Sequence, residues 1–126
     1  MPAYSSAGNR VSLANSGDAL VVWNAESPAT NSASQQVALG AGQTQDTLAV
    51  SVEVKFSGAP GTFSITPQVA DTDVDAAYVS QGSPITTVNT DNYALLQITG
   101  LRCNFFRLFM TDDPANSVTT TATVTL

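Results

Sequence analysis

The residues best suited to bind an ion are three alternating aspartates within the D-T-D-V-D segment at positions 71–75. Ca²⁺ takes six to eight oxygen ligands. In an extended segment the three carboxylates would share one side, where they repel one another unless a cation binds. The EF-hand template also requires Gly and Glu where this chain has Ala76 and Gly82. The alternative is a solvated turn whose side chains cap backbone N–H groups. We expect no metal site, and the only candidate calcium ligands are Asp71, Asp73 and Asp75.

The chain lacks the side chains that most enzymes use for acid–base or nucleophilic catalysis. It contains no histidine, which removes the most common general base, the Ser-His-Asp triad and most transition-metal sites. Without a histidine to activate it, Cys103 is interpreted as a small core residue. Asp112 and Asp113 precede Pro114 and are interpreted as a hairpin turn, because glycosidases need two carboxylates on opposite sides of a cleft. We predict that the protein is not an enzyme and uses no cofactor.

Aromatic residues leave a carbohydrate-binding function open. The single tryptophan, Trp23, could form a sugar-stacking platform together with Tyr4, Tyr78 or Tyr93. A lone tryptophan at the end of the apolar run 20–23 is more often a core residue. A carbohydrate-binding sandwich module is therefore an alternative function.

The composition indicates one acidic domain with an unusually uncharged surface. The chain has 126 residues, 43% of them hydrophobic and only 11% charged, with a net charge of −6. Uncharged polar side chains are easier to desolvate at an interface than charged ones. Nucleic acids and anionic membranes would repel the chain, so neither is an expected partner. The cations form no basic run and are Arg10, Lys55, Arg102 and Arg107.

The cysteine content and the apolar runs suggest where the chain is made. A single cysteine allows no internal disulfide. The first residues have neither a charged start nor an apolar stretch of signal-peptide length, and no apolar run is long enough to span a bilayer. We therefore expect synthesis in a reducing host cytoplasm.

Hydrophobic residues alternate with period two, which is typical of β-strands with one buried face. The clearest cases are residues 48–56 and the Thr-rich segment 118–126. Turn signals recur about every eight to twelve residues, which predicts an all-β antiparallel β-sandwich or jelly-roll-like fold with about eight to ten short strands. Little or no helix is expected, apart from a single turn near 73–78. The other expected strands are 10–14, 19–24, 35–39, 62–69, 77–80, 85–88, 93–99 and 104–111.

The domain organisation is predicted to be simple. Residues 1–8 are expected to form an extended N-terminal arm, and residues 9–126 a single sandwich domain. Segment 26–34 is poor in apolar residues and is interpreted as a loop. Segment 57–61 has glycine at its second and last positions and is interpreted as a hairpin loop.

Segment 104–111 differs from the other strands because it is apolar on both faces. Such a strand is either covered on both sides or packs against another subunit. We interpret it as an interface strand, and the alternative is that a loop of the same chain covers its outer face. The interface candidates are Tyr4 of the arm and Phe105, Arg107 and Phe109 of the strand.

Residues 54–78, followed by F-F-R-L-F at 105–109 and a Thr/Val-rich terminal strand, resemble small β-sandwich virion proteins of tailed bacteriophages. The resemblance covers about the last two-thirds of the chain. It implies a structural role as a capsid decoration (cement) protein that bridges and stabilises capsomers on the outer head surface. A tail, neck, baseplate or fibre component is the alternative. The implied partners are the major capsid protein or other virion proteins, and further copies of this chain in a homo-oligomer.

Overall fold

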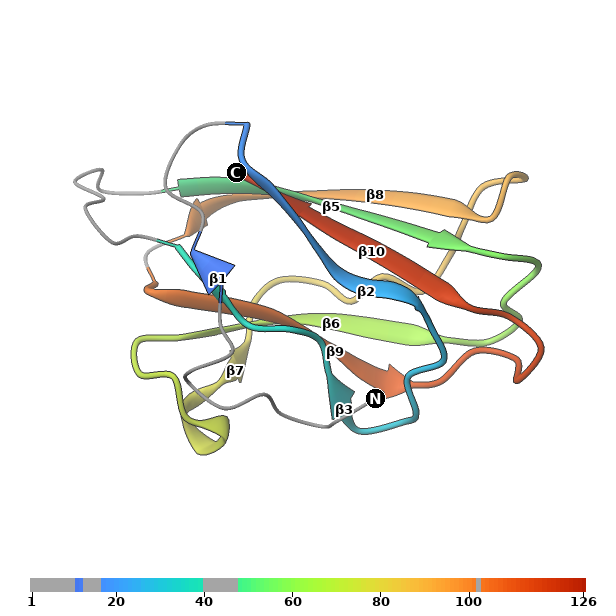
Figure 1. Cartoon of the computed structure of the whole chain (residues 1–126), viewed down its shortest axis with the longest axis horizontal. Helices are drawn as coiled ribbons and strands as arrows, with labels where there is room; N and C mark the ends of the chain where they lie inside the picture. The colour runs from blue at the N-terminus through green and yellow to red at the C-terminus, as the bar shows by residue number, and fades with distance from the viewer. Residues whose placement is uncertain (1–10, 13–16, 40–47, 102) are drawn as a thin grey trace.

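The computed structural model of the chain describes residues 11–12, 17–39, 48–101 and 103–126. Two β-sheets pack face to face (Figure 1). The four-stranded sheet has the order β2 (Ala19–Glu26), β10 (Thr120–Thr125), β5 (Leu48–Phe56) and β8 (Tyr93–Leu101). The six-stranded sheet has the order β1 (Val11–Ser12), β4 (Val37–Ala38), β9 (Phe105–Asp112), β6 (Ser64–Ala70) and β7 (Val79–Ser80), and β3 (Ser32–Ala33) also pairs with β9. The predicted all-β sandwich is confirmed.

The strand pairing defines a jelly roll. If β3 and β4 are counted as two halves of one strand, the chain from β2 to β10 forms one long hairpin, at whose open end β2 pairs with β10. Its successive pairs are β2 with β10, β3 and β4 with β9, β5 with β8, and β6 with β7. Winding this hairpin brings β10 beside β5 and β9 beside β6, which divides the strands between two sheets. All of these pairs are antiparallel, whereas the additional short strand β1 pairs with β4 in parallel.

This topology corrects two turn predictions. Segment 57–61 was expected to close a hairpin, but β5 and β6 lie in different sheets and do not pair. The turn at 112–114 likewise connects β9 of one sheet to β10 of the other. Both segments arch over the edge of the sandwich. The same Gly, Pro and Asp residues reverse the chain in a hairpin and in an arch, so local turn signals cannot distinguish them.

Inward-facing side chains of the two sheets form one core. Residues Val50, Val52, Val54 and Phe56 of β5 alternate inward, as period two predicts, and all are at most 2% exposed. The inward residues of β9 pack opposite them. At one end the rings of Phe56 and Phe63 meet edge to face, with centroids 4.7 Å apart. Other large buried members of the core are Trp23, Leu39, Ile65, Leu101, Phe106, Leu108 and Met110.

Smaller differences from the prediction occur at the sheet margins. Residues 85–88 form no strand, and only Ile85 makes an isolated bridge, to Ile65. The predicted loop 26–34 contains the short strand β3, whose alanine and serine side chains carry little hydrophobic signal. Within the described residues, the only helix is the 3₁₀ turn η2 (Asp75–Ala77), inside the predicted one-turn segment. No helix among them is long and apolar enough to cross a membrane.

Candidate interaction surface

The three alternating aspartates do not converge on one point. Asp73 is only 8% exposed, and its Oδ1 accepts a hydrogen bond from the Tyr78 hydroxyl at 2.9 Å. Asp75 lies in η2 and binds the guanidinium of Arg107, with 2.8 Å between Oδ1 and an Nη atom. Asp71 is exposed, and its backbone carbonyl accepts a hydrogen bond from the Asn104 side chain. Across the described ranges, no group of three His, Cys, Asp or Glu side chains is arranged to hold a metal ion.

Asp73 and Asp75 instead hold a loop over the outer face of β9. Arg107 projects from this face, yet its side chain is only 3% exposed. Its Nε donates to Gln68 Oε1 at 2.7 Å, and the Tyr78 ring stacks on the guanidinium, 4.1 Å from the ring centroid. Phe109 flanks the same guanidinium at 5.5 Å. We call Gln68, Asp75, Tyr78 and Arg107 the arginine clasp.

The arginine clasp covers part of the outer face of β9. Its inner residues enter the core, while loop 71–78 covers Arg107 from outside. For Arg107 the structure therefore favours the alternative in which the chain covers its own strand. Phe105 and Phe109 are half-buried, and their interface role remains a prediction. Tyr4 lies outside the described residues.

The other residues with potential chemistry do not form a site. Trp23 is fully buried and Tyr78 belongs to the arginine clasp, so neither contributes to an exposed sugar-stacking platform. The Tyr93 hydroxyl forms a hydrogen bond with the Glu53 side chain. Desolvation together with this carboxylate raises the pKa of Tyr93. Cys103 is half-buried against the core, and burial, reinforced by the charge of Asp71, raises its pKa to about 11. Its thiol is therefore protonated at neutral pH.

The turn after β9 also lacks the features of a glycosidase site. Asp112 and Asp113 are sequence neighbours at the end of a strand, and the Asp113 backbone N–H donates to Thr30 Oγ1 at 3.0 Å. This bond ties the arch to the loop before β3. The two carboxylates are part of a turn and do not lie on opposite sides of a cleft.

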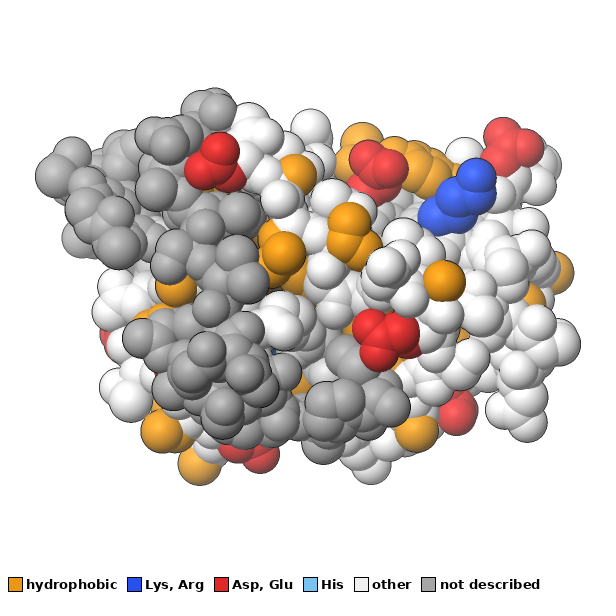
Figure 2. Space-filling model, viewed as in Figure 1, with side chains coloured by type: hydrophobic (Ala, Val, Ile, Leu, Met, Phe, Trp, Pro, Cys, Tyr) orange, Lys and Arg blue, Asp and Glu red, His pale blue; other side chains and the backbone are white. Residues whose placement is uncertain are grey.

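The broadest candidate surface is the outer face of the four-stranded sheet. The strand register places its outward residues in rows across all four strands, and one row contains Val21, Thr123, Glu53 and Leu95. Val21 is 46% exposed and Leu95 is 54% exposed. In the adjacent rows Lys55 is the only charged outward residue of β5, β8 and β10. Figure 2 shows charged side chains scattered singly among uncharged ones on the visible side of the molecule. The other outward residues of this face are Ala19, Ser51, Tyr93, Gln97, Thr121 and Thr125.

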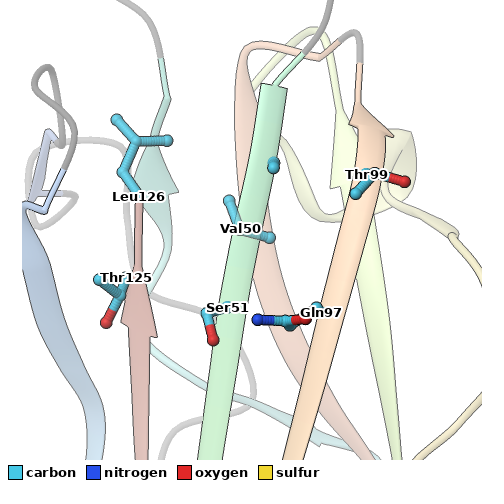
Figure 3. A pocket seen from close by; sticks show the side chains of 7 residues that line it. Val50, Ser51, Gln97, Thr99, Thr125 and Leu126 are labelled. Atoms are coloured by element: carbon cyan, nitrogen blue, oxygen red, sulfur yellow. The ribbon is translucent and has the colours of Figure 1, made fainter.

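At one end of this face lies an open hollow of about 300 Å³. Its polar side chains come from three neighbouring strands, as Figure 3 shows: Thr125 from β10, Ser51 from β5, and Gln97 and Thr99 from β8. Apolar groups of Ala49, Val50 and Leu126 complete the lining. The hollow contains no charged and no aromatic side chain, so it offers a contact surface without a strong ligand-binding group.

Sequence reasoning missed this face, although the sequence contained a signal for it. Val21-Val22 and Leu95-Leu96 are adjacent apolar pairs within strands. Because neighbouring residues of a strand point to opposite faces, one member of each pair must lie outside.

No family model matches the chain, and no curated protein matches it.

Proposed function

We propose that this chain is a non-enzymatic structural protein of a virus particle, acting as a decoration (cement) protein on the outer head surface. The observation that carries the proposal is the outer face of the four-stranded sheet, which is broad, nearly uncharged and built from Thr, Ser, Gln and aliphatic side chains. Such a face loses little hydration free energy when another subunit covers it.

The charge distribution supports an outer position. The net charge of −6 would be repelled by packaged DNA. Of the cations that the structure describes, Arg107 is held in the arginine clasp, and Lys55 lies on the same face of β5 as the acidic Glu53. The described part of the chain therefore has no basic surface for binding a phosphate backbone. Binding to a capsid protein does not require a basic surface.

The fold is compatible with this function but does not select it. Jelly rolls form viral capsid domains and also lectin domains, and one fold serves many functions. The lectin function has less support here, because Trp23 is buried and no aromatic side chain lines the hollow near Gln97. The resemblance of residues 54–78 and 105–109 to phage virion proteins favours the capsid function.

Quantifying the chain in purified particles tests the proposal. Particles from a culture that produces the chain would be separated into heads and tails, and its copies counted against the major capsid protein by mass spectrometry. A decoration protein is expected on heads in hundreds of copies, since it follows the symmetry of the shell. A few copies on tails would instead support a tail, neck, baseplate or fibre component. Absence from particles would overturn both assignments.

A further inference from the structure

The four-stranded sheet has a long edge strand without the usual protection against pairing. β8 covers Tyr93–Leu101 and lies at the end of the strand order, so its second side has no partner strand among the described elements (Figure 1). Natural edge strands are blocked by charges, prolines, bulges or short length. β8 has nine residues, none charged and none proline. Its register with β5 is regular from Tyr93 to Ile98, and the one register shift follows between Ile98 and Leu101.

The backbone groups that face this open side can be assigned. Antiparallel ladders alternate between hydrogen-bonded and non-bonded pairs. Phe56 N–H donates to Asn92 C=O at 2.9 Å, so this pair is bonded. The alternation then directs the backbone groups of Ala94, Leu96 and Ile98 toward β5. Those of Tyr93, Leu95 and Gln97, together with the N–H of Thr99, point away from the sheet.

Both ends of this open side are closed by the chain itself. At the start, Asn89 satisfies both outward groups of Tyr93: its N–H donates to Tyr93 C=O, and its side chain accepts from Tyr93 N–H. At the other end, Gly100 has φ +72° and interrupts the regular strand. Between these ends, the outward N–H and C=O groups of Leu95 and Gln97 and the outward N–H of Thr99 have no hydrogen-bond partner in the described part of the chain.

The other three edges differ from this one. β1 and β7 have two residues each, which is too short to pair extensively. β2 has register shifts against β10, and Ala25 within it has φ 50°. Its outer side also accepts a hydrogen bond at Val22 C=O from Gln35 N–H. The open window in β8 is therefore specific to that strand.

We propose that β8 is a self-association edge, which pairs antiparallel with β8 of a second copy around a twofold axis at Gln97. This register pairs Gln97 with Gln97 of the other copy and Leu95 with Thr99. It uses all three open residues and forms four backbone hydrogen bonds, two between the Gln97 residues and one from each Thr99 N–H to Leu95 C=O. The two four-stranded sheets become one eight-stranded sheet, and their uncharged outer faces become continuous. The inference stands whether or not the chain is found in virus particles.

A second copy fits this edge because the strand is compatible with itself. A twofold axis at Gln97 brings the same short segment of both copies together, so charges in this segment would place like charges close to one another. β8 carries no charge, and the nearest charged outward residues, Glu53 and Lys55, lie one strand away on β5. Exposed Leu95 gains an apolar contact with the Thr99 methyl group of the other copy. A three-residue window buries little area, so we expect a dissociation constant on the order of 10–100 μM.

Proline substitution separates backbone pairing from side-chain contact. Gln97→Pro removes an N–H that points away from β5, so the fold should survive, because edge strands tolerate proline at such positions. Gln97→Ala, the matched control, shortens the side chain but keeps the N–H. By sedimentation velocity of the full chain, we expect a concentration-dependent dimer whose dissociation constant rises at least tenfold in Gln97→Pro and less than threefold in Gln97→Ala. A wild-type chain that stays monomeric at 500 μM, or equal weakening by both variants, would overturn the proposal.

A cross-linking experiment tests the axis independently of Gln97→Pro. Bonded antiparallel partners have Cα atoms about 5.5 Å apart, within the disulfide range. In a Cys103→Ser background, which removes the only native thiol, Gln97→Cys should form a disulfide-linked dimer under mild oxidation. Thr123→Cys on the central strand β10 is the control and should remain monomeric. No cross-link at position 97, or equal cross-linking at both positions, would refute the edge pairing.

Discussion

Replacing Arg107 by glutamate is expected to destabilise the fold strongly, because the side chain is buried under loop 71–78. The guanidinium makes two charge-assisted hydrogen bonds, to Gln68 and to Asp75, and stacks on Tyr78. Each such bond contributes about 1.5–3 kcal/mol, with a smaller share at Asp75 because that side chain is 65% exposed and regains water. Glutamate would in addition place a second carboxylate beside Asp75. The total loss is about 4 kcal/mol, against a typical stability of about 5–15 kcal/mol.

The assay is urea unfolding followed by fluorescence of Trp23, which is the only tryptophan and is fully buried. With a slope of about 1–3 kcal/mol per molar urea, the midpoint of Arg107→Glu should fall by about 2 M. The control is Arg107→Met, which keeps an apolar stem under Tyr78. We expect it to lose only about 1–2 kcal/mol, since methionine adds no buried charge and the released Asp75 carboxylate, which is 65% exposed, is solvated by water. An unchanged midpoint for Arg107→Glu would show that the arginine clasp does not form.

Three further predictions concern the core, the thiol and the acidic segment. Val52→Asp should abolish the cooperative unfolding transition, because it buries an unpaired charge at a fully buried position, whereas Glu53→Asp on the outer face should not. Alkylation of Cys103 should be slow at pH 7.5 and accelerate toward its pKa of about 11. Asp71→Asn should shift this pH–rate profile to lower pH. A profile centred near pH 8.5 would contradict the burial of the thiol. Calcium should leave the melting temperature unchanged, whereas Asp73→Asn should lower it with or without calcium by weakening the bond to the Tyr78 hydroxyl; a calcium-dependent rise lost in Asp73→Asn would reveal a site.

The raised pKa of Cys103 also determines how its contribution to the free energy of unfolding changes with pH. Burial favours the neutral thiol, so the folded-state pKa lies above that of the unfolded chain. The contribution is therefore fully present below the unfolded pKa near 9 and is lost as the pH rises toward 11. Cys103→Ser should flatten this alkaline decline in urea midpoints measured between pH 8 and pH 11.

The sequence predicted individual strands well because period two is a local signal. Residues 48–56 became β5 with the same bounds, since four alternating apolar side chains can be buried together only from an extended backbone. The pairing of these strands could not be predicted. β2 and β10 are neighbours although about 100 residues separate them, and only the global winding of the chain brings them together.

The arginine clasp and the open edge of β8 were also beyond reach of sequence reasoning, for a related reason. The acidic segment 71–75 was interpreted as an ion-binding or solvated turn because its partner, Arg107, lies more than thirty residues away. An edge strand and a central strand have the same alternating pattern, so the sequence of β8 does not reveal that one side is open. Both features depend on which strands become neighbours.

The position of β10 has a consequence for how the protein acquires its fold during synthesis. This strand is the last of the sandwich to be made, yet it lies between β2 and β5 inside its sheet. Until residues 120–125 leave the ribosome, β2 has no neighbour strand in its sheet and one side of β5 is open, so the four-stranded sheet cannot assemble. With nearly every strand contact joining distant parts of the chain, folding is expected to be slow. Nascent chains stalled before Thr120 should therefore be protease-sensitive in β2, which then lacks its strand neighbour.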